Sequence, residues 1–340
     1  MMIAKRTTIA FSLALIMLSL ASAQDVGKKE ADQKLARTKI LLVVGAAGTD
    51  EYAESFSQWA AKWDQVGKAS GSDVVAIGRD EVQKQSDRER LETAITALDK
   101  NAITPVWLVL IGHGTFAGNV AKFNLRGLDV SATELSGWLQ PIQRPIVVVN
   151  CASSSGPFVN RLSGPQRVIV TATKSGTEQN FARFGQYFAN AIGALDSDLD
   201  HDDEVSVQEA FLRASADVKV FYDSDARIIT EHALLDDNGD GKGTPASMFR
   251  GTRAIAKAKK GAKLDGAIAA RITLTPEGSR LPFTEEEIEQ RRTVEVELDE
   301  LRKRKSELSE ADYEAKLEPL MIRLAKIYRI VEARADAEEQ

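Results

Sequence analysis

Short apolar runs alternate with amphipathic segments along residues 38–250. Runs that are apolar throughout lie at 39–44, 74–77, 106–111, 146–150 and 168–172. Strands that are buried on both faces of a parallel sheet have this continuous pattern. Helical spacing or helix-capping residues predict helices between them, at 52–63, 80–98, 131–139, 180–192 and 207–220. The alternation predicts the α/β class, with a mostly parallel sheet between two helical layers.

Two reactive side chains directly follow predicted strands. In a parallel sheet, ligands bind beyond the carboxyl ends of the strands. His113 and Gly114 follow the strand at 106–111, and Cys151 follows the strand at 146–150. A nearby imidazole can generate the thiolate that attacks a carbonyl carbon. The backbone N–H groups of Gly114 and Cys151 could then stabilise the oxyanion. Taken alone, a buried cysteine at a strand end is usually structural, but the two positions together predict a dyad.

The segments 106–114 and 146–156 resemble the caspase-like cysteine peptidases, most closely the legumain (C13) branch and its bacterial relatives. The segment 168–176, which runs into Phe184-Gly185, is similar to the next strand and helix of that family. The resemblance covers roughly residues 38–250 and implies a caspase-like three-layer sandwich, for which we expect a domain at 38–270. It implies His113 as the catalytic histidine, Cys151 as the nucleophile and Gly114 as an oxyanion contributor.

The resemblance also implies a reaction and a class of substrate. Cys151 would attack a peptide carbonyl, and the thioester acyl-enzyme would be released by water, or by an amine in a transpeptidase. Legumains carry a basic residue just past a tyrosine in the loop after the first strand, whereas Tyr52 is followed here by Ala53. The legumain preference for asparagine is therefore not carried over. Thr173 and Ser175 are candidates for the substrate pocket by position only.

An acidic segment at 198–209 fits the twelve-position calcium loop of an EF-hand. Oxygen ligands are expected at positions 1, 3, 5, 9 and 12, with a backbone carbonyl at position 7. The predicted ligands are Asp198, Asp200, Asp202, Glu204, Ser206 and Glu209. Position 6 is Asp203 where glycine is usual, so the sharp turn there must be strained. The alternative is a solvated acidic turn. Because clustered acids repel each other, we expect calcium to order this segment beside the active-site crevice.

A second segment, 236–243, resembles the first half of such a loop. Asp236, Asn238 and Asp240 occupy the first ligand positions, but no glutamate stands at position 12. The segment is either a partial metal site or a glycine-rich turn. Calcium is the one cofactor predicted, and no organic cofactor is expected.

The last part of the chain, 284–340, has a different pattern. Two helix starts, at Thr284 and Ser309, are followed by apolar residues at steps of three and four. The stronger apolar seam is formed by Leu317, Leu320, Leu324, Ile327 and Val331, and the weaker one by Ile288, Leu298, Leu301 and Leu308. The pattern predicts an antiparallel helical hairpin, kinked at Pro319, that caps the domain or forms a homo-oligomer.

Residues 1–23 have the features of a secretory signal peptide. Lys5 and Arg6 precede an apolar stretch at 9–20, and Ala-Ser-Ala at 21–23 is a cleavage signature. The alternative is an uncleaved anchor. We expect a mature chain that begins at Gln24 with a polar leader at 24–37. It would be secreted or periplasmic, with no membrane contact after cleavage.

Composition changes this picture in two ways. The 340 residues include 44 basic and 50 acidic side chains, a net charge of −6, so the basic face of a nucleic-acid-binding protein is not expected. The chain also has a single cysteine, although exported proteins usually use cysteines in pairs. Cys151 is therefore a dimer disulfide, an inert buried residue or a reactive thiol.

The sequence favours an exported cysteine endopeptidase that acts on a peptide or protein through a His-Cys dyad and is stabilised by calcium. The first alternative is a catalytically inactive calcium-binding interaction module on a caspase-like scaffold. A structural coiled-coil protein is the second alternative.

Overall fold

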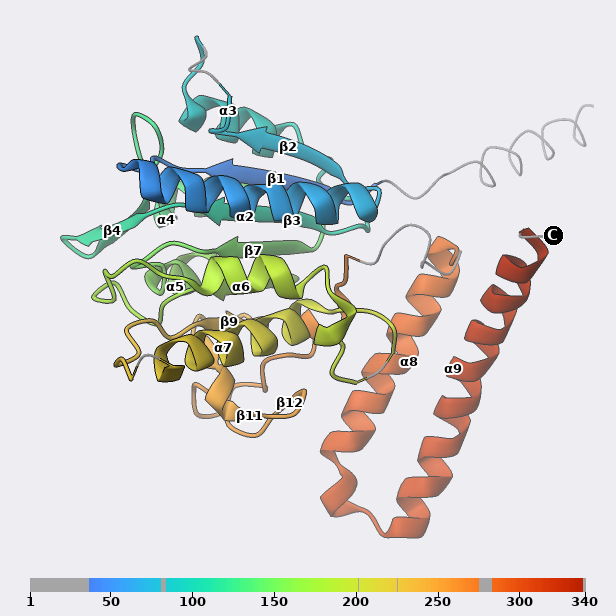
Figure 1. The fold of residues 1–340 in the computed structure, drawn as a ribbon. Coiled ribbons are helices and arrows are strands. Elements are labelled where there is room, and N and C mark those ends of the chain that lie inside the picture. Colours follow the sequence, from blue (N-terminus) through green and yellow to red (C-terminus); the bar gives the residue numbers. More distant parts are fainter. Residues whose placement is uncertain (1–36, 81–83, 201, 225, 275–282, 339–340) are drawn as a thin grey trace, which may run out of the picture. The chain divides into compact units, whose positions relative to one another are not determined.

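The predicted apolar runs form the centre of one large β-sheet (Figure 1). The computed structural model describes residues 37–80, 84–200, 202–224, 226–274 and 283–338. Seven strands lie in the order β10-β9-β8-β7-β3-β1-β2. They are β1 (Lys39–Val44), β2 (Asp73–Ile77), β3 (Val106–Ile111), β7 (Ile146–Asn150), β8 (Arg167–Thr171), β9 (Leu234–Asp236) and β10 (Thr244–Pro245). Neighbouring strands are parallel from β2 to β8, whereas β9 and β10 join the other side antiparallel.

Helices cover both faces of this sheet. One face packs against α2 (Asp50–Ala69), α6 (Phe184–Ala191) and α7 (Val207–Ser224), and the other against α3 (Asp87–Thr96), α4 (Ala132–Leu139) and α5 (Pro157–Leu162). Side chains of β3 alternate between these two cores, with Trp107 and Val109 on the α2 face and Leu108 and Leu110 on the α3 face. Burial on both faces explains the continuous apolar runs. The predicted α/β class and mostly parallel sheet are confirmed.

Several small elements were not predicted from the sequence. After β3 the chain forms a three-stranded antiparallel sheet from β4 (Gly114–Ala117), β5 (Val120–Phe123) and β6 (Val130–Ser131). A two-stranded ribbon follows later from β11 (Phe249–Arg250) and β12 (Arg253–Ala254). These strands are short and partly exposed, so they lack the apolar runs that mark the central sheet.

Two helices begin later than the sequence pattern predicts, and a cap explains each difference. Helix α3 begins at Asp87, because Ser86 and Glu89 form a capping box there. Helix α6 begins at Phe184, because the buried carboxylate of Glu231 accepts hydrogen bonds from the backbone N–H groups of Arg183 and Phe184. Glu231 lies far along the chain, so local sequence cannot reveal this cap.

The predicted C-terminal hairpin is present as α8 (Glu285–Lys303) and α9 (Glu310–Glu338). Val294, Leu298 and Ile327 form its small core, against which Leu317, Leu320 and Leu324 are partly buried. Helix α9 continues through Pro319. In the described part of the chain, no helix combines the length and the apolar character needed to cross a membrane. The predicted signal peptide and nearly all of the leader fall outside the described residues.

The parallel strands give the sheet two distinguishable sides, one at their amino ends and one at their carboxyl ends. Because β7 is parallel to β3, the residues that follow these strands lie at one edge, called here the carboxyl edge. Helix α7 has 18 residues and is therefore about 27 Å long. Near its end, the Tyr222 hydroxyl donates to Glu231, which caps the start of α6 on the carboxyl-edge side. The start of α7 is consequently at the opposite amino edge, as Figure 1 shows.

Candidate functional site at the carboxyl edge

His113 lies at the carboxyl edge in an aromatic surrounding. Its ring is half-buried and has edge contacts with Tyr52 and Phe56 of α2 and with Phe181, at centroid distances of 4.7, 5.1 and 6.1 Å. Its Nε2 lies 3.1 Å from the carbonyl oxygen of Ala47. A carbonyl oxygen only accepts, so Nε2 carries the proton in this arrangement and Nδ1 is the ring nitrogen left to accept one.

Cys151 lies at the same edge, but its side chain points into the core. The residue is 1% exposed and belongs to the core on the α2 face. A Cβ added at Gly185 of α6 would lie 2.5 Å from Cys151 Cβ and 2.9 Å from its Sγ, so the helix backbone covers the thiol directly. Burial raises the pKa of Cys151 to about 12. The hydrogen bonds among described residues do not join His113 to Cys151, although both residues lie at the carboxyl edge.

The predicted oxyanion donors differ in availability. The N–H of Cys151 donates to the carbonyl oxygen of Leu110 at 2.9 Å, so the prediction that it serves as a second donor is wrong. The N–H of Gly114 has only a long contact of 3.5 Å with Ser153 Oγ. The side chain beside Gly114 is that of Ala152, because a Cβ at Gly114 would lie 3.3 Å from Ala152 Cβ.

The two pocket candidates are both engaged in local hydrogen bonds. Thr173 is completely buried, and its hydroxyl contacts Ser155 Oγ at 3.1 Å and accepts from the N–H of Gly156 at 3.2 Å. It therefore braces the loop after β7 and does not face an open pocket. Ser175 is half-buried and its hydroxyl contacts Thr177 Oγ1 at 2.9 Å.

Sequence reasoning missed a His-Glu pair at this edge. Nδ1 of His232 lies 2.6 Å from a carboxylate oxygen of Glu178. The other oxygen of Glu178 accepts from the backbone N–H groups of Lys174 and His232, and the carbonyl of Glu178 accepts from the N–H of Ser154. The pair joins the loops that contain Ser154, Glu178 and His232. No sequence motif predicts it, because His232 and Glu178 lie 54 residues apart.

The acidic loop 198–209 contains a compact group of carboxylates. One oxygen each from Asp198, Asp200 and Asp202 lies within 4.8 Å of the others. Partial desolvation, together with the charges of Asp200 and Glu204, raises the pKa of Asp202 to about 6. Asp203 has φ +65°, so the position where glycine is usual does adopt the left-handed conformation. Oxygen ligands at this spacing suit calcium.

Glu209 and Ser206 close this loop at the start of α7. The Glu209 carboxylate is 3% exposed. One of its oxygens accepts from the N–H groups of Leu199 and Asp200, and the other from the N–H and hydroxyl of Ser206. Calcium binding through Glu209 would exchange some of these bonds. The loop is at the amino edge, so the expectation that it adjoins the active-site crevice is wrong, because α7 separates it from the carboxyl edge.

The acidic loop is also connected to the C-terminal part of the chain. Ser206 and Thr273 form an antiparallel bridge, and the N–H of Val207 donates to the carbonyl oxygen of Ile272. A carboxylate oxygen of Glu204 lies 4.0 Å from the Arg291 guanidinium of α8. A cation bound in this loop would therefore lie where α7, the segment at 272–274 and α8 contact one another.

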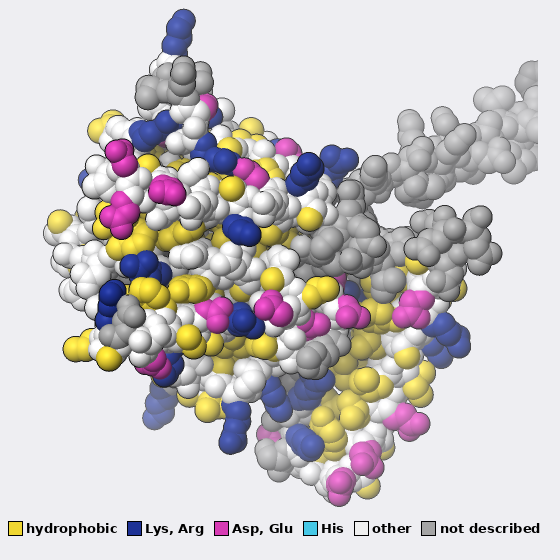
Figure 2. Space-filling view, in the orientation of Figure 1, with side chains coloured by type: hydrophobic (Ala, Val, Ile, Leu, Met, Phe, Trp, Pro, Cys, Tyr) yellow, Lys and Arg dark blue, Asp and Glu magenta, His cyan; other side chains and the backbone are white. Residues whose placement is uncertain are grey.

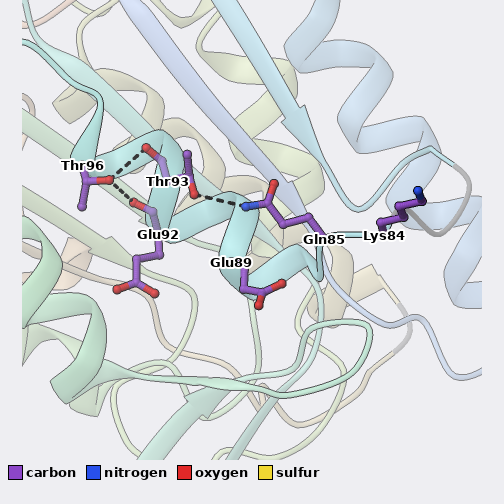
Figure 3. Close-up of a pocket in the computed structure, with 6 residues that line it drawn as sticks. All are labelled: Lys84, Gln85, Glu89, Glu92, Thr93 and Thr96. Atoms are coloured by element: carbon purple, nitrogen blue, oxygen red, sulfur yellow. Dashed lines mark hydrogen bonds between the residues drawn. The ribbon is translucent and has the colours of Figure 1, made fainter.

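The surface depression shown in Figure 3 lies along α3 and contains none of the predicted site residues. It is lined by Lys84, Gln85, Glu89, Glu92, Thr93 and Thr96. On the face shown in Figure 2, acidic and basic side chains of the described residues are interspersed.

Comparison with protein-family models and with curated proteins finds no match. Solved structures with a similar fold include the Drosophila initiator caspase Dronc, with 17% sequence identity and a TM-score of 0.41 over 62% of this chain and 84% of that one. Raptor from Chaetomium thermophilum has 11% identity and a TM-score of 0.33 over 47% of this chain and 18% of its own. A Geobacter sulfurreducens protein has 13% identity and a TM-score of 0.37 over 58% and 92%. These likenesses define no activity for this chain.

Proposed function

We propose that the chain is a calcium-binding interaction module on a caspase-like α/β scaffold and that it does not carry out cysteine-peptidase chemistry. The position of the Cys151 side chain carries this proposal. A nucleophilic cysteine must be a thiolate that the substrate can reach. Cys151 is 1% exposed, lies under α6, and has a pKa raised to about 12. A neutral, covered thiol suits a structural role.

In this proposal calcium binds the acidic loop 198–209. Asp198, Asp200 and Asp202 supply the first carboxylates, Glu204 its backbone carbonyl, and Ser206 and Glu209 the remaining oxygens. The spacing and the close approach of the three aspartates support this assignment. The ion would stabilise the junction with α8.

The interaction role falls to the hairpin, and the proposed partner is a second copy of the chain. Val296 of α8 and Met321, Ile322 and Ile330 of α9 are between 43% and 56% exposed. In this proposal the second copy covers these exposed side chains. The N-terminal segment supports a secreted or periplasmic location.

Calcium titration of the chelator-treated protein, followed by calorimetry, tests the proposed function. The double variant Asp198→Asn/Asp200→Asn should lose one bound calcium per chain, because it removes two of the three clustered carboxylates. Asp223→Asn, at an aspartate whose side chain is 56% exposed on α7, is the matched control and should bind as wild type. An unchanged stoichiometry and affinity in the double variant would exclude the loop as a calcium site.

A second candidate function is an exported cysteine endopeptidase with His113 and Cys151 as its dyad. One observation favours it: these residues follow the adjacent parallel strands β3 and β7 and so share the carboxyl edge. For this chemistry the start of α6 must move off Cys151, and His113 would accept the thiol proton on Nδ1 while Nε2 keeps its bond to Ala47.

A further inference from the structure

The loop between β9 and β10, residues 237–243, is folded by side chains that accept hydrogen bonds from the backbone two residues further along. The side-chain oxygen of Asn238 accepts from the N–H of Asp240 at 2.8 Å, and Asp240 Oδ1 accepts from the N–H of Lys242 at 2.7 Å. Gly239 and Gly241 have φ +77° and +72°, values that glycine adopts without strain. The turn is thus fixed by its own residues.

Two buried aspartates hold this loop against the segment at 265–269, and their oxygens are fully used. The Asp237 carboxylate accepts from the N–H groups of Gly266, Ile268 and Ala269. The Asp265 carboxylate accepts from the N–H groups of Asp237 and Asn238 and from the Thr244 hydroxyl. These two acids are therefore structural, and they support the loop from behind.

Asp236, at the end of β9, differs from these two aspartates in its hydrogen bonding. It is 0% exposed, and neither of its carboxylate oxygens has a hydrogen-bond partner of normal geometry among the described residues. Asp240 Oδ2 is also buried without a partner there. The ion pairs of the described residues include neither of these aspartates. Three carboxylate oxygens are therefore withdrawn from water without a hydrogen bond of normal geometry or a cation among the described residues, which is costly for a folded protein.

The two carboxylates are also close enough to affect each other. Burial is the main cause that raises the pKa of Asp236 to about 6, and the charges of Asp240 and Asp237 raise it further. The Ser163 hydroxyl offsets part of this rise, although its approach does not meet the geometry of a full hydrogen bond. Ser163 Oγ also accepts from the N–H of Gly241. Side-chain oxygens from two segments of the chain, the β9–β10 region and the loop before β8, thus lie close together.

We propose that Asp236 and Asp240, with the side-chain oxygens of Asn238 and Ser163 beside them, bind a hard divalent cation, with calcium as the preferred ion. Oxygen donors alone favour such a cation. The site lacks the bidentate glutamate that closes a complete calcium loop, so its affinity should be modest, with a Kd on the order of 10⁻⁴ M. It is separate from the acidic loop 198–209 and would tie the end of β9 to the loop that precedes β8.

Calcium titration in the Asp198→Asn/Asp200→Asn background isolates this site. One calcium per chain should remain, and adding Asp236→Asn should weaken its binding at least tenfold. In chelator, the Asp236→Asn variant should melt no lower than its parent, because the amide removes a buried charge without changing the shape of the side chain. Adding Asp223→Asn instead serves as the control and should leave binding unchanged.

Each outcome bears on one site only. Retention of calcium binding after Asp236→Asn, or absence of a calcium-dependent rise in melting temperature in the Asp198→Asn/Asp200→Asn background, would overturn the second site. Neither result would affect the calcium assignment of the loop 198–209, which depends on the comparison of wild type with Asp198→Asn/Asp200→Asn.

Discussion

Iodoacetamide at pH 8 should modify Cys151 in the native protein at least about 1,000-fold more slowly than in the unfolded chain. The pKa of the thiol rises from 9.0 to about 12 on burial, and each unit lowers the thiolate fraction about tenfold. The α6 backbone beside Sγ adds a steric barrier. Mass spectrometry can follow the reaction, because Cys151 is the only cysteine.

The same experiment in denaturant is the control and should give rapid, complete modification. His113→Ala should leave the slow native rate unchanged, since no hydrogen bond joins His113 to Cys151 among the described residues. Rapid native labelling that falls in His113→Ala would instead indicate an activated dyad and would contradict a structural role for the thiol.

Replacing Glu209 by alanine should lower the free energy of unfolding by about 3 kcal/mol or more in the absence of calcium. The change removes the acceptor of three backbone N–H groups, those of Leu199, Asp200 and Ser206. The Ser206 donor is buried and the other two are partly buried, and a buried donor left without a partner costs about 1–3 kcal/mol. Denaturant unfolding followed by circular dichroism measures the difference.

Glu204→Ala, in the same loop, is the matched control for this change. One of its carboxylate oxygens lies 4.0 Å from the Arg291 guanidinium, and loss of a partly exposed ion pair of this kind costs less than about 1 kcal/mol. Equal stability of Glu209→Ala and Glu204→Ala would show that the Glu209 carboxylate does not organise the start of α7.

The sequence predicts the central sheet well for a physical reason. Strands β1, β3, β7 and β8 are buried on both faces, so their apolar runs are unbroken. Strand β9 has only three residues and ends in Asp236, so its own apolar pattern is too short to predict a strand. It is a strand because it pairs with β8. The hairpin is equally predictable, because its seam repeats at helical spacing.

The sequence predicts where His113 and Cys151 lie in the sheet, but it does not predict how their side chains are oriented. Parallel topology puts His113 and Cys151 at one edge, as the sequence indicates. Side chains of a strand alternate between faces, so a shift of one residue reverses the direction of a side chain. Val147, Val149 and Cys151 share the core on the α2 face, whereas Val148 and Ala152 lie in the other core. Counting this alternation from β7 predicts the α2 face for Cys151, the face on which His113 contacts Tyr52 and Phe56, but it does not predict that α6 covers the thiol.

The bracing of the β9–β10 loop could not be predicted in this way. Asp237 and Asp265 hold each other's backbone segments across 28 residues of sequence. Such reciprocal contacts depend on the packed structure, and neither periodicity nor motif spacing encodes them.

Hydrolysis of a mixed peptide library in the presence of calcium, compared between wild type and Cys151→Ala, tests the central claim most directly. The proposed non-catalytic role predicts that neither protein cleaves the library above the background of a buffer control. Cleavage by wild type that disappears in both Cys151→Ala and His113→Ala would contradict this role and establish the chain as a cysteine peptidase.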